Sequence, residues 1–132
     1  MRSEGATLCV LDASAVLALL NDEAGSDHVA ERLGDALISA VNWCEVAERA
    51  LSVGLGLGGL KEELEDLGLR VAGFDSVHAE LTAVLREPTR ELGLSLADRA
   101  CLALAADLEV PALTADRSWD DLDIGVEVEL IR

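Results

Sequence analysis

The chain has 132 residues, the size of one domain, and 51% of them are hydrophobic, which excludes a disordered chain. Its 26 acidic and 10 basic residues give a formal net charge of −16, which excludes a broad basic face that wraps nucleic acid. The apolar run near the charged N-terminal stretch stops at Asp12, too short for a signal peptide or a membrane span, so we expect a cytoplasmic protein.

Apolar runs of strand length alternate with helix-favouring segments along the whole chain. In chain order the sequence predicts a strand at 8–11, helices at 15–20 and 26–33, a strand at 36–39, helices at 42–53 and 60–67, a strand at 69–74, helices at 76–87 and 97–108, and strands at 111–114 and 126–130. This alternation predicts one α/β domain over residues 1–132, with a mostly parallel central sheet of four to five strands flanked by helices on both faces.

The glycine-rich stretch 54–59 matches the dinucleotide-binding pattern GxGxxG. That pattern binds a dinucleotide when it follows a strand, whereas here it follows a predicted helix. We therefore interpret it as a turn between two helices.

Four acidic residues stand at the ends of predicted elements: Asp12, Glu45, Asp98 and Asp116. Asp12 and Asp116 each follow a short apolar strand, and each has a hydroxyl two residues away, on Ser14 and Thr114. Each of the four acids also has a structural explanation, as a helix N-cap or as part of a capping box. If the strands are parallel neighbours, however, all four acids point into one crevice at the carboxyl edge of the sheet.

Carboxylates gathered in one crevice need a counter-charge. Two of them about 4 Å apart repel by roughly 4 kcal/mol at an effective dielectric constant of ~20, so they raise their pKa values or recruit a cation. Oxygen ligands favour Mg²⁺ or Mn²⁺ over zinc, and such a site suits phosphodiester hydrolysis. Ser14 and Thr114 would then orient the ligands by hydrogen bonding.

Four stretches in order along the chain resemble the PIN-domain nucleases, and specifically the VapC toxins of prokaryotic toxin–antitoxin pairs. They are Val10-Leu-Asp12-Ala-Ser14, Asn42-x-x-Glu45-Val46, Ser95-Leu-Ala-Asp98-Arg99-Ala-Cys101-Leu-Ala-Leu and Leu113-Thr114-Ala-Asp116-Arg117-Ser-Trp119. The resemblance implies a Mg²⁺- or Mn²⁺-dependent endoribonuclease whose acidic residues are Asp12, Glu45, Asp98 and Asp116. It also implies an inhibitory VapB-type antitoxin, a homodimer, and contact with DNA only through the antitoxin.

Four arginines in or near these stretches are candidates for contact with RNA phosphates: Arg86, Arg90, Arg99 and Arg117. For Arg86 and Arg90 the alternative is a solvated charge at a helix end. Trp119 either stacks on a base or lies in the core. Small cysteine side chains are expected to pack beneath the site, at Cys9, Cys44 and Cys101.

Two other functions remain open. The first is a metal-dependent small-molecule phosphohydrolase on a similar fold, which resembles the haloacid-dehalogenase-like phosphatases; they require Asp-x-Asp, and Ser14 stands in place of the second Asp. The second is a protein whose main task is to bind its partner and regulate its own operon. A basic residue of that partner is expected to reach into the acidic crevice, because the chain is so acidic.

Overall fold

The structure, a computed structural model, describes residues 8–132, so the charged N-terminal stretch lies outside the described residues. Five parallel strands form one sheet in the order β3-β2-β1-β4-β5. They are β1 (Cys9–Leu11), β2 (Ala36–Ser39), β3 (Arg70–Ala72), β4 (Ala112–Thr114) and β5 (Val128–Leu130). From β1 the chain extends the sheet first to β3 and later, on the other side, to β5, so the strand order switches direction beside β1.

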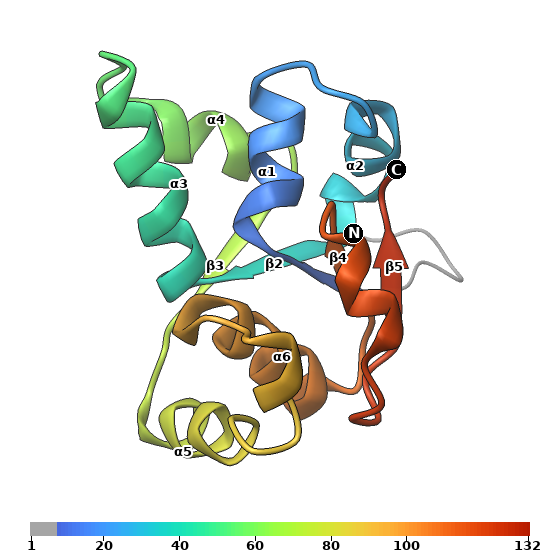
Figure 1. Cartoon of the computed structure of the whole chain (residues 1–132). Coiled ribbons are helices and arrows are strands. Elements are labelled where there is room, and N and C mark those ends of the chain that lie inside the picture. The colour runs from blue at the N-terminus through green and yellow to red at the C-terminus, as the bar shows by residue number, and fades with distance from the viewer. Residues whose placement is uncertain (1–7) are drawn as a thin grey trace.

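Helices cover both faces of this sheet (Figure 1). They are α1 (Ala13–Leu20), α2 (Ser26–Arg32), α3 (Ala40–Ser52), α4 (Leu60–Asp66), α5 (Ser76–Val84) and α6 (Leu96–Leu108). Helices α1, α2 and α4 lie on one face, α5 and α6 lie on the other, and α3 contacts both α1 and α6. The predicted fold class is confirmed. Within residues 8–132, no helix is both long enough and apolar enough to cross a membrane.

Alternate side chains of the central strands enter two separate apolar clusters. Cys9 and Leu11 of β1 pack on the side of α1 and α2, whereas Val10 packs on the side of α6. Because both faces are covered, the central strands β1 and β4 are buried throughout and read as nearly continuous apolar runs. Trp119 is completely buried in the α6 cluster, as its interpretation as a core residue predicts. The prediction for the cysteines is wrong for Cys44, because α3 exposes that side chain to solvent.

Three helix boundaries differ from the prediction by two residues or more. Helix α1 begins at Ala13 and not at residue 15, because Asp12 caps it directly after β1. Helix α3 begins at Ala40 and not at Asn42, because the hydroxyl of Ser39 accepts a hydrogen bond from the backbone N–H of Val41 and caps the helix directly after β2. Helix α5 ends at Val84, three residues early. Pro88 explains this end, because a proline ring clashes with the carbonyl four residues before it. The stretch 54–59 is a turn between α3 and α4, as predicted.

His78 links α5 to α6. Its Nε2 lies 3.0 Å from Oδ2 of Asp107, and its Nδ1 lies 3.2 Å from the carbonyl oxygen of Gly73. The hydrogen bond with Asp107 is the largest effect that raises the pKa of His78 above its ordinary value of 6.5. A histidine whose pKa is raised by folding stabilises the fold fully below its unfolded pKa, and this stabilisation is lost as the pH rises through the folded pKa.

We predict that His78→Gln lowers the free energy of unfolding at about pH 5.5 by about 0.5 kcal/mol, the size of an exposed ion pair, and has a smaller effect at about pH 8.5. Urea denaturation at the two pH values measures the difference. Asp107→Asn removes the same contact from the other side and should show the same dependence on pH. Equal losses at both pH values would contradict this account of His78.

Candidate active site

An open pocket of about 370 Å³ lies at the carboxyl edge of the sheet, beside the switch in strand order. Eight residues line it: Asp12, Ala13, Ser14, Leu17, Glu45, Arg49, Asp98 and Asp116. The four acids come from four separate parts of the chain. Asp12 and Asp116 follow β1 and β4, Glu45 lies in the second turn of α3, and Asp98 lies in the first turn of α6. The fold therefore brings the four predicted acids to one pocket, and their catalytic role stays a prediction.

Asp12 is the most deeply buried of the four acids, with 4% of its surface exposed. Its Oδ1 accepts hydrogen bonds from the hydroxyl of Ser14 at 2.7 Å and the backbone N–H of Ala15 at 2.9 Å, and its Oδ2 accepts one from the hydroxyl of Thr114 at 2.5 Å. Burial raises the pKa of Asp12 to about 6, although these hydrogen bonds act in the opposite direction. The nearby charge of Asp98 raises this pKa further, so a cation beside Asp12 would be stabilising.

The hydroxyls of Ser14 and Thr114 join Asp12 to the segment that carries Asp116. Besides donating to Asp12, Ser14 Oγ accepts from the backbone N–H of Ala115 at 2.9 Å. Thr114 Oγ1 accepts from the backbone N–H of Asp116 at 3.0 Å. The two ends of neighbouring strands are thus held in one hydrogen-bond network, which sets the orientation of the Asp12 carboxylate.

The other three acids each use one oxygen in the fold. Asp98 Oδ2 accepts from the backbone N–H of Ser95 at 3.0 Å and completes a capping box at the start of α6. Asp116 Oδ1 accepts from both the backbone N–H and the hydroxyl of Ser118. Glu45 Oε1 lies 3.4 Å from the side-chain amide nitrogen of Asn42 in α3. In each carboxylate the second oxygen accepts no hydrogen bond from the described residues, so capping and ligand binding are compatible.

Asn42 is a residue of the site whose role sequence reasoning missed. It is 1% exposed, and its Nδ2 lies 3.4 Å from Glu45 Oε1 and 3.0 Å from the carbonyl oxygen of Ala97. Burial, with the charge of Asp98 adding to it, raises the pKa of Glu45, whereas the contact with Asn42 opposes this rise. Asn42 therefore ties the acid of α3 to the start of α6. The spacing Asn-x-x-Glu is visible in the sequence, where it predicts only the start of a helix.

None of the arginines predicted to contact RNA lines the acidic pocket: Arg86, Arg90, Arg99 and Arg117. Nη1 of Arg99 donates to the backbone oxygen of Thr82, and Nη1 of Arg117 donates to that of Arg132, so both guanidinium groups hold parts of the fold together. The other two side chains are exposed. For all four, contact with RNA stays a prediction. Sequence reasoning missed Arg49, although it follows Glu45 by four residues and so lies on the same helix face.

The pocket suits Mg²⁺ or Mn²⁺ by the chemistry of its donors, which are carboxylate and hydroxyl oxygens. Among residues 8–132, no three His, Cys, Asp or Glu side chains are arranged to hold a metal ion. Mg²⁺ usually keeps several water ligands and takes only one or two protein carboxylates. An open pocket lined by four separated acids therefore fits a hydrated ion in charge and donor type.

The chain belongs to the PIN domain family, whose model matches residues 9–125. The matched region contains the four acids, Ser14 and Thr114, and it confirms the family that the sequence resemblance suggested. A search of curated proteins finds no significant match.

Several solved structures are similar over nearly the whole chain. A toxin–antitoxin complex from Klebsiella pneumoniae has a TM-score of 0.71 and 19% identity, with 94% of this chain and 98% of that chain covered. FitAcB from Neisseria gonorrhoeae has a TM-score of 0.66 and 26% identity, with 92% and 96% covered. VapC20 from Mycobacterium tuberculosis, a toxin that cleaves the sarcin–ricin loop, has a TM-score of 0.67 and 17% identity, with 90% and 98% covered.

We predict that Asp12→Asn stabilises the metal-free protein at neutral pH. The substitution keeps the shape of the side chain and removes a charge that burial disfavours, and a pKa raised by about two units corresponds to at most about 3 kcal/mol. Thermal unfolding in EDTA measures the change. Asp98→Ala is the comparison and should lose about 0.5–1 kcal/mol instead, because it removes the side-chain acceptor of the capping box. A lower melting temperature for Asp12→Asn would contradict the prediction.

We predict that Asn42→Ala lowers the free energy of unfolding by about 1–3 kcal/mol, because it removes a buried donor from the Ala97 carbonyl and from Glu45. Urea denaturation measures this loss. Asn21→Ala, at the exposed end of α1, is the control and should change stability by less than about 0.5 kcal/mol. Equal losses of the free energy of unfolding for Asn42→Ala and Asn21→Ala would contradict a role of Asn42 in joining α3 to α6.

Proposed function

We propose that this chain is the metal-dependent endoribonuclease toxin of a VapBC-type toxin–antitoxin pair. The observation that carries the proposal is the meeting of Asp12, Glu45, Asp98 and Asp116 in one pocket of a PIN domain. The similar structures support it, since they include a toxin–antitoxin complex and a toxin that cleaves the sarcin–ricin loop. Such a toxin would act in the cytoplasm, where its RNA substrates are.

The four acids would hold Mg²⁺ or Mn²⁺ directly or through water. When bound, the ion lowers the pKa of water and offsets charge on the phosphate. Asp12 supplies a fixed oxygen, since three hydrogen bonds hold its carboxylate and little reorganisation is needed when charge develops. Glu45, Asp98 and Asp116 would each supply the oxygen that accepts no hydrogen bond from the described residues. Ser14 and Thr114 keep Asp12 in place.

We predict that the purified chain cleaves RNA with Mg²⁺ or Mn²⁺ and not in EDTA, and that Asp98→Asn and Asp116→Asn each lower the rate at least about 100-fold. Incubation with total RNA, followed by mapping of the new ends, measures this activity. Asp123→Asn, an exposed acid outside the pocket, is the control and should cleave as the parent does.

Two results would contradict the nuclease proposal. Release of inorganic phosphate from small monoesters, with RNA left intact, would favour a phosphohydrolase. Full growth arrest by Asp98→Asn would favour a protein that acts only by binding a partner.

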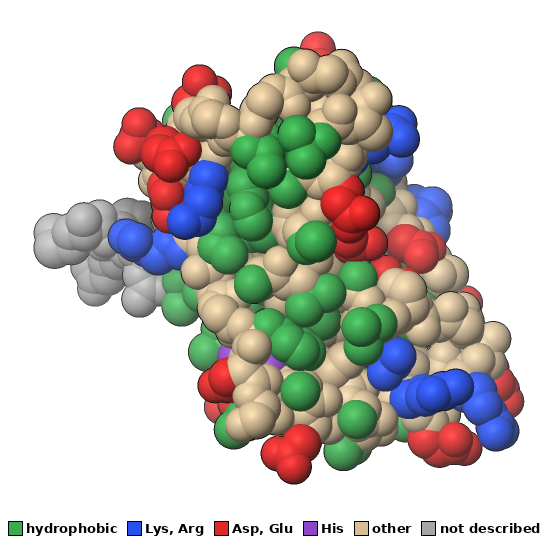
Figure 2. Space-filling view, turned by 90° about the vertical axis from the view of Figure 1, so that its left-hand side faces the viewer, with side chains coloured by type: hydrophobic (Ala, Val, Ile, Leu, Met, Phe, Trp, Pro, Cys, Tyr) green, Lys and Arg blue, Asp and Glu red, His purple; other side chains and the backbone are tan. Residues whose placement is uncertain are grey.

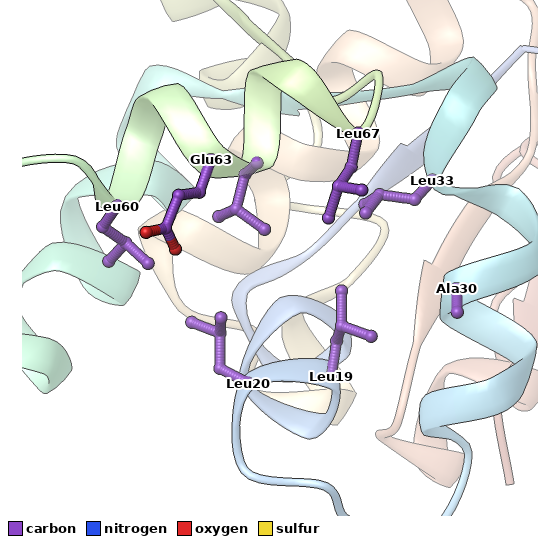
Figure 3. A pocket seen from close by; sticks show the side chains of 8 residues that line it. Leu19, Leu20, Ala30, Leu33, Leu60, Glu63 and Leu67 are labelled. Atoms are coloured by element: carbon purple, nitrogen blue, oxygen red, sulfur yellow. The ribbon is translucent and has the colours of Figure 1, made fainter.

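An apolar groove continues from the acidic pocket. Its first part, about 260 Å³, shares Leu17 and Arg49 with the pocket. Its second part, about 270 Å³, shares Leu20 and Leu60 with the first and lies between α1, α2 and α4. Figure 3 shows the leucines of α1 and α4 pointing toward one another across this second part. Figure 2 shows apolar side chains gathered in the upper part of the left-hand face of Figure 1, where α3 and α4 lie.

We propose that an antitoxin segment occupies this groove and places a basic residue in the acidic pocket. The groove is lined almost entirely by apolar side chains, which suits an amphipathic segment of a partner. The continuity with four acids, in a chain of net charge −16, favours a cationic group at the end of that segment.

We predict that Leu20→Glu weakens the complex with a VapB-type antitoxin that binds the parent chain by about 10-fold or more, because it places a charge in an apolar interface. Leu108→Glu is the matched control, since Leu108 is 39% exposed and Leu20 is 38% exposed, but Leu108 lies on the other face. Calorimetric titration at two salt concentrations measures the affinity. An affinity that is indifferent to salt, to Asp12→Asn and to Leu20→Glu would contradict the proposed mode of binding.

A further inference from the structure

Arg49 is a cation that lines the same pocket as the four acids. It lies in α3, one helical turn after Glu45, and its side chain is exposed. Among residues 8–132, it is the one lysine or arginine that lines the acidic pocket. It also lines the first part of the apolar groove. Arg49 therefore stands where the pocket opens into the groove.

The guanidinium group of Arg49 has no partner among the described residues. No carboxylate there lies within 4.0 Å of it and no acceptor there takes its hydrogen bonds, whereas Arg32, Arg90 and Arg132 each form an ion pair. An arginine offers five N–H donors in a planar fork. This fork belongs to the same pocket as the four acids and forms no ion pair with any of them, so it is free to bind a ligand.

The chemistry of the pocket restricts what this ligand is. A free anion would be repelled, because the four acids outnumber the one arginine. A nucleic acid strand carries several phosphates in a row. One phosphate can bind the cation that the acids would hold, and a neighbouring phosphate can bind the guanidinium group of Arg49. The planar fork matches the oxygens of a phosphate and binds them through two parallel hydrogen bonds.

We propose that Arg49 binds a backbone phosphate of the RNA strand that enters the acidic pocket, and that it directs the strand toward the groove between α1 and α3. This inference rests on the proposed nuclease function. It gives the acidic chain one local contact with RNA in place of a basic face. It also means that RNA and a partner bound in the groove compete for the same residue.

The first experiment measures the binding of a short single-stranded RNA that contains a mapped cleavage site. Fluorescence anisotropy with Ca²⁺ in place of Mg²⁺ reports the affinity. Arg49→Ala should weaken binding by about 10-fold, as loss of a charged hydrogen-bond pair does, and should reduce the salt dependence of log K by about 0.7. Arg49→Lys should recover only part of the loss, because it keeps the charge without the fork. Arg70→Ala, an exposed arginine that lies outside the pocket at the start of β3, should bind as the parent does.

The second experiment locates the phosphate. Single methylphosphonate groups, which carry no charge, replace the phosphates of the same RNA one at a time. One replacement near the cleavage site should weaken binding to the parent chain, and the same replacement should have no further effect with Arg49→Ala, as expected for two groups in direct contact. Losses that add at every position would overturn the proposal.

A calorimetric titration with Mn²⁺ separates a binding role from a structural one. Arg49→Ala should bind Mn²⁺ at least as tightly as the parent, because a positive charge near the acids has been removed. Weaker Mn²⁺ binding would show that the substitution disturbs the pocket and would overturn the proposal. If the parent cleaves RNA but Arg49→Ala binds and cleaves it equally well, this inference alone fails. If the parent cleaves no RNA, the proposed function fails first and the inference falls with it.

Discussion

The pairing of β1 with β4 places a buried carboxylate at the centre of the sheet edge, and the rest of the site depends on this placement. The register aligns Leu11 with Leu113, so that Asp12 and Thr114 come next to each other at the two strand ends. The hydroxyls of Ser14 and Thr114 then hold Asp12 in a position where little water reaches it. A carboxylate that is buried and hydrogen-bonded but has no cationic partner is unfavourable by itself, and a bound cation relieves that cost.

The remaining acids serve the fold and the pocket together. Asp98 caps α6 and Asp116 caps the short turn after β4, each with one oxygen. Their other oxygens accept no hydrogen bond from the described part of the chain. Each cap therefore orients the carboxylate and leaves one oxygen available to a ligand. This arrangement explains why each acid, taken singly, looks like an ordinary helix cap. The strand ends and helix starts of a parallel sheet meet at one edge, and caps gathered there become a cluster of oxygen donors.

The same edge joins two kinds of surface. The acidic pocket passes into an apolar groove through residues that line both, and Arg49 stands at this boundary. A chain with a net charge of −16 repels nucleic acid over most of its surface, so any attraction for RNA has to be local. A basic partner, in contrast, is attracted by the same negative charge along the whole length of its contact with this chain. In the functions proposed here, partner and substrate therefore meet on one face, and binding of one excludes the other.

The alternation of strands and helices, the parallel sheet and the four acids were predictable from the sequence, because apolar periodicity and the residue at a strand end are local patterns. The tertiary structure decided which polar side chains reach the pocket. Arg49, Arg99 and Arg117 look alike in the sequence, yet only Arg49 lines the pocket, while the other two donate to backbone oxygens elsewhere in the fold. Asn42 likewise has the sequence pattern of a helix start, but in the structure Ser39 caps α3 and Asn42 lies within its first turn. Packing between distant segments sets how a helix is rotated about its axis and which carbonyl a side chain contacts. No local sequence pattern encodes that packing.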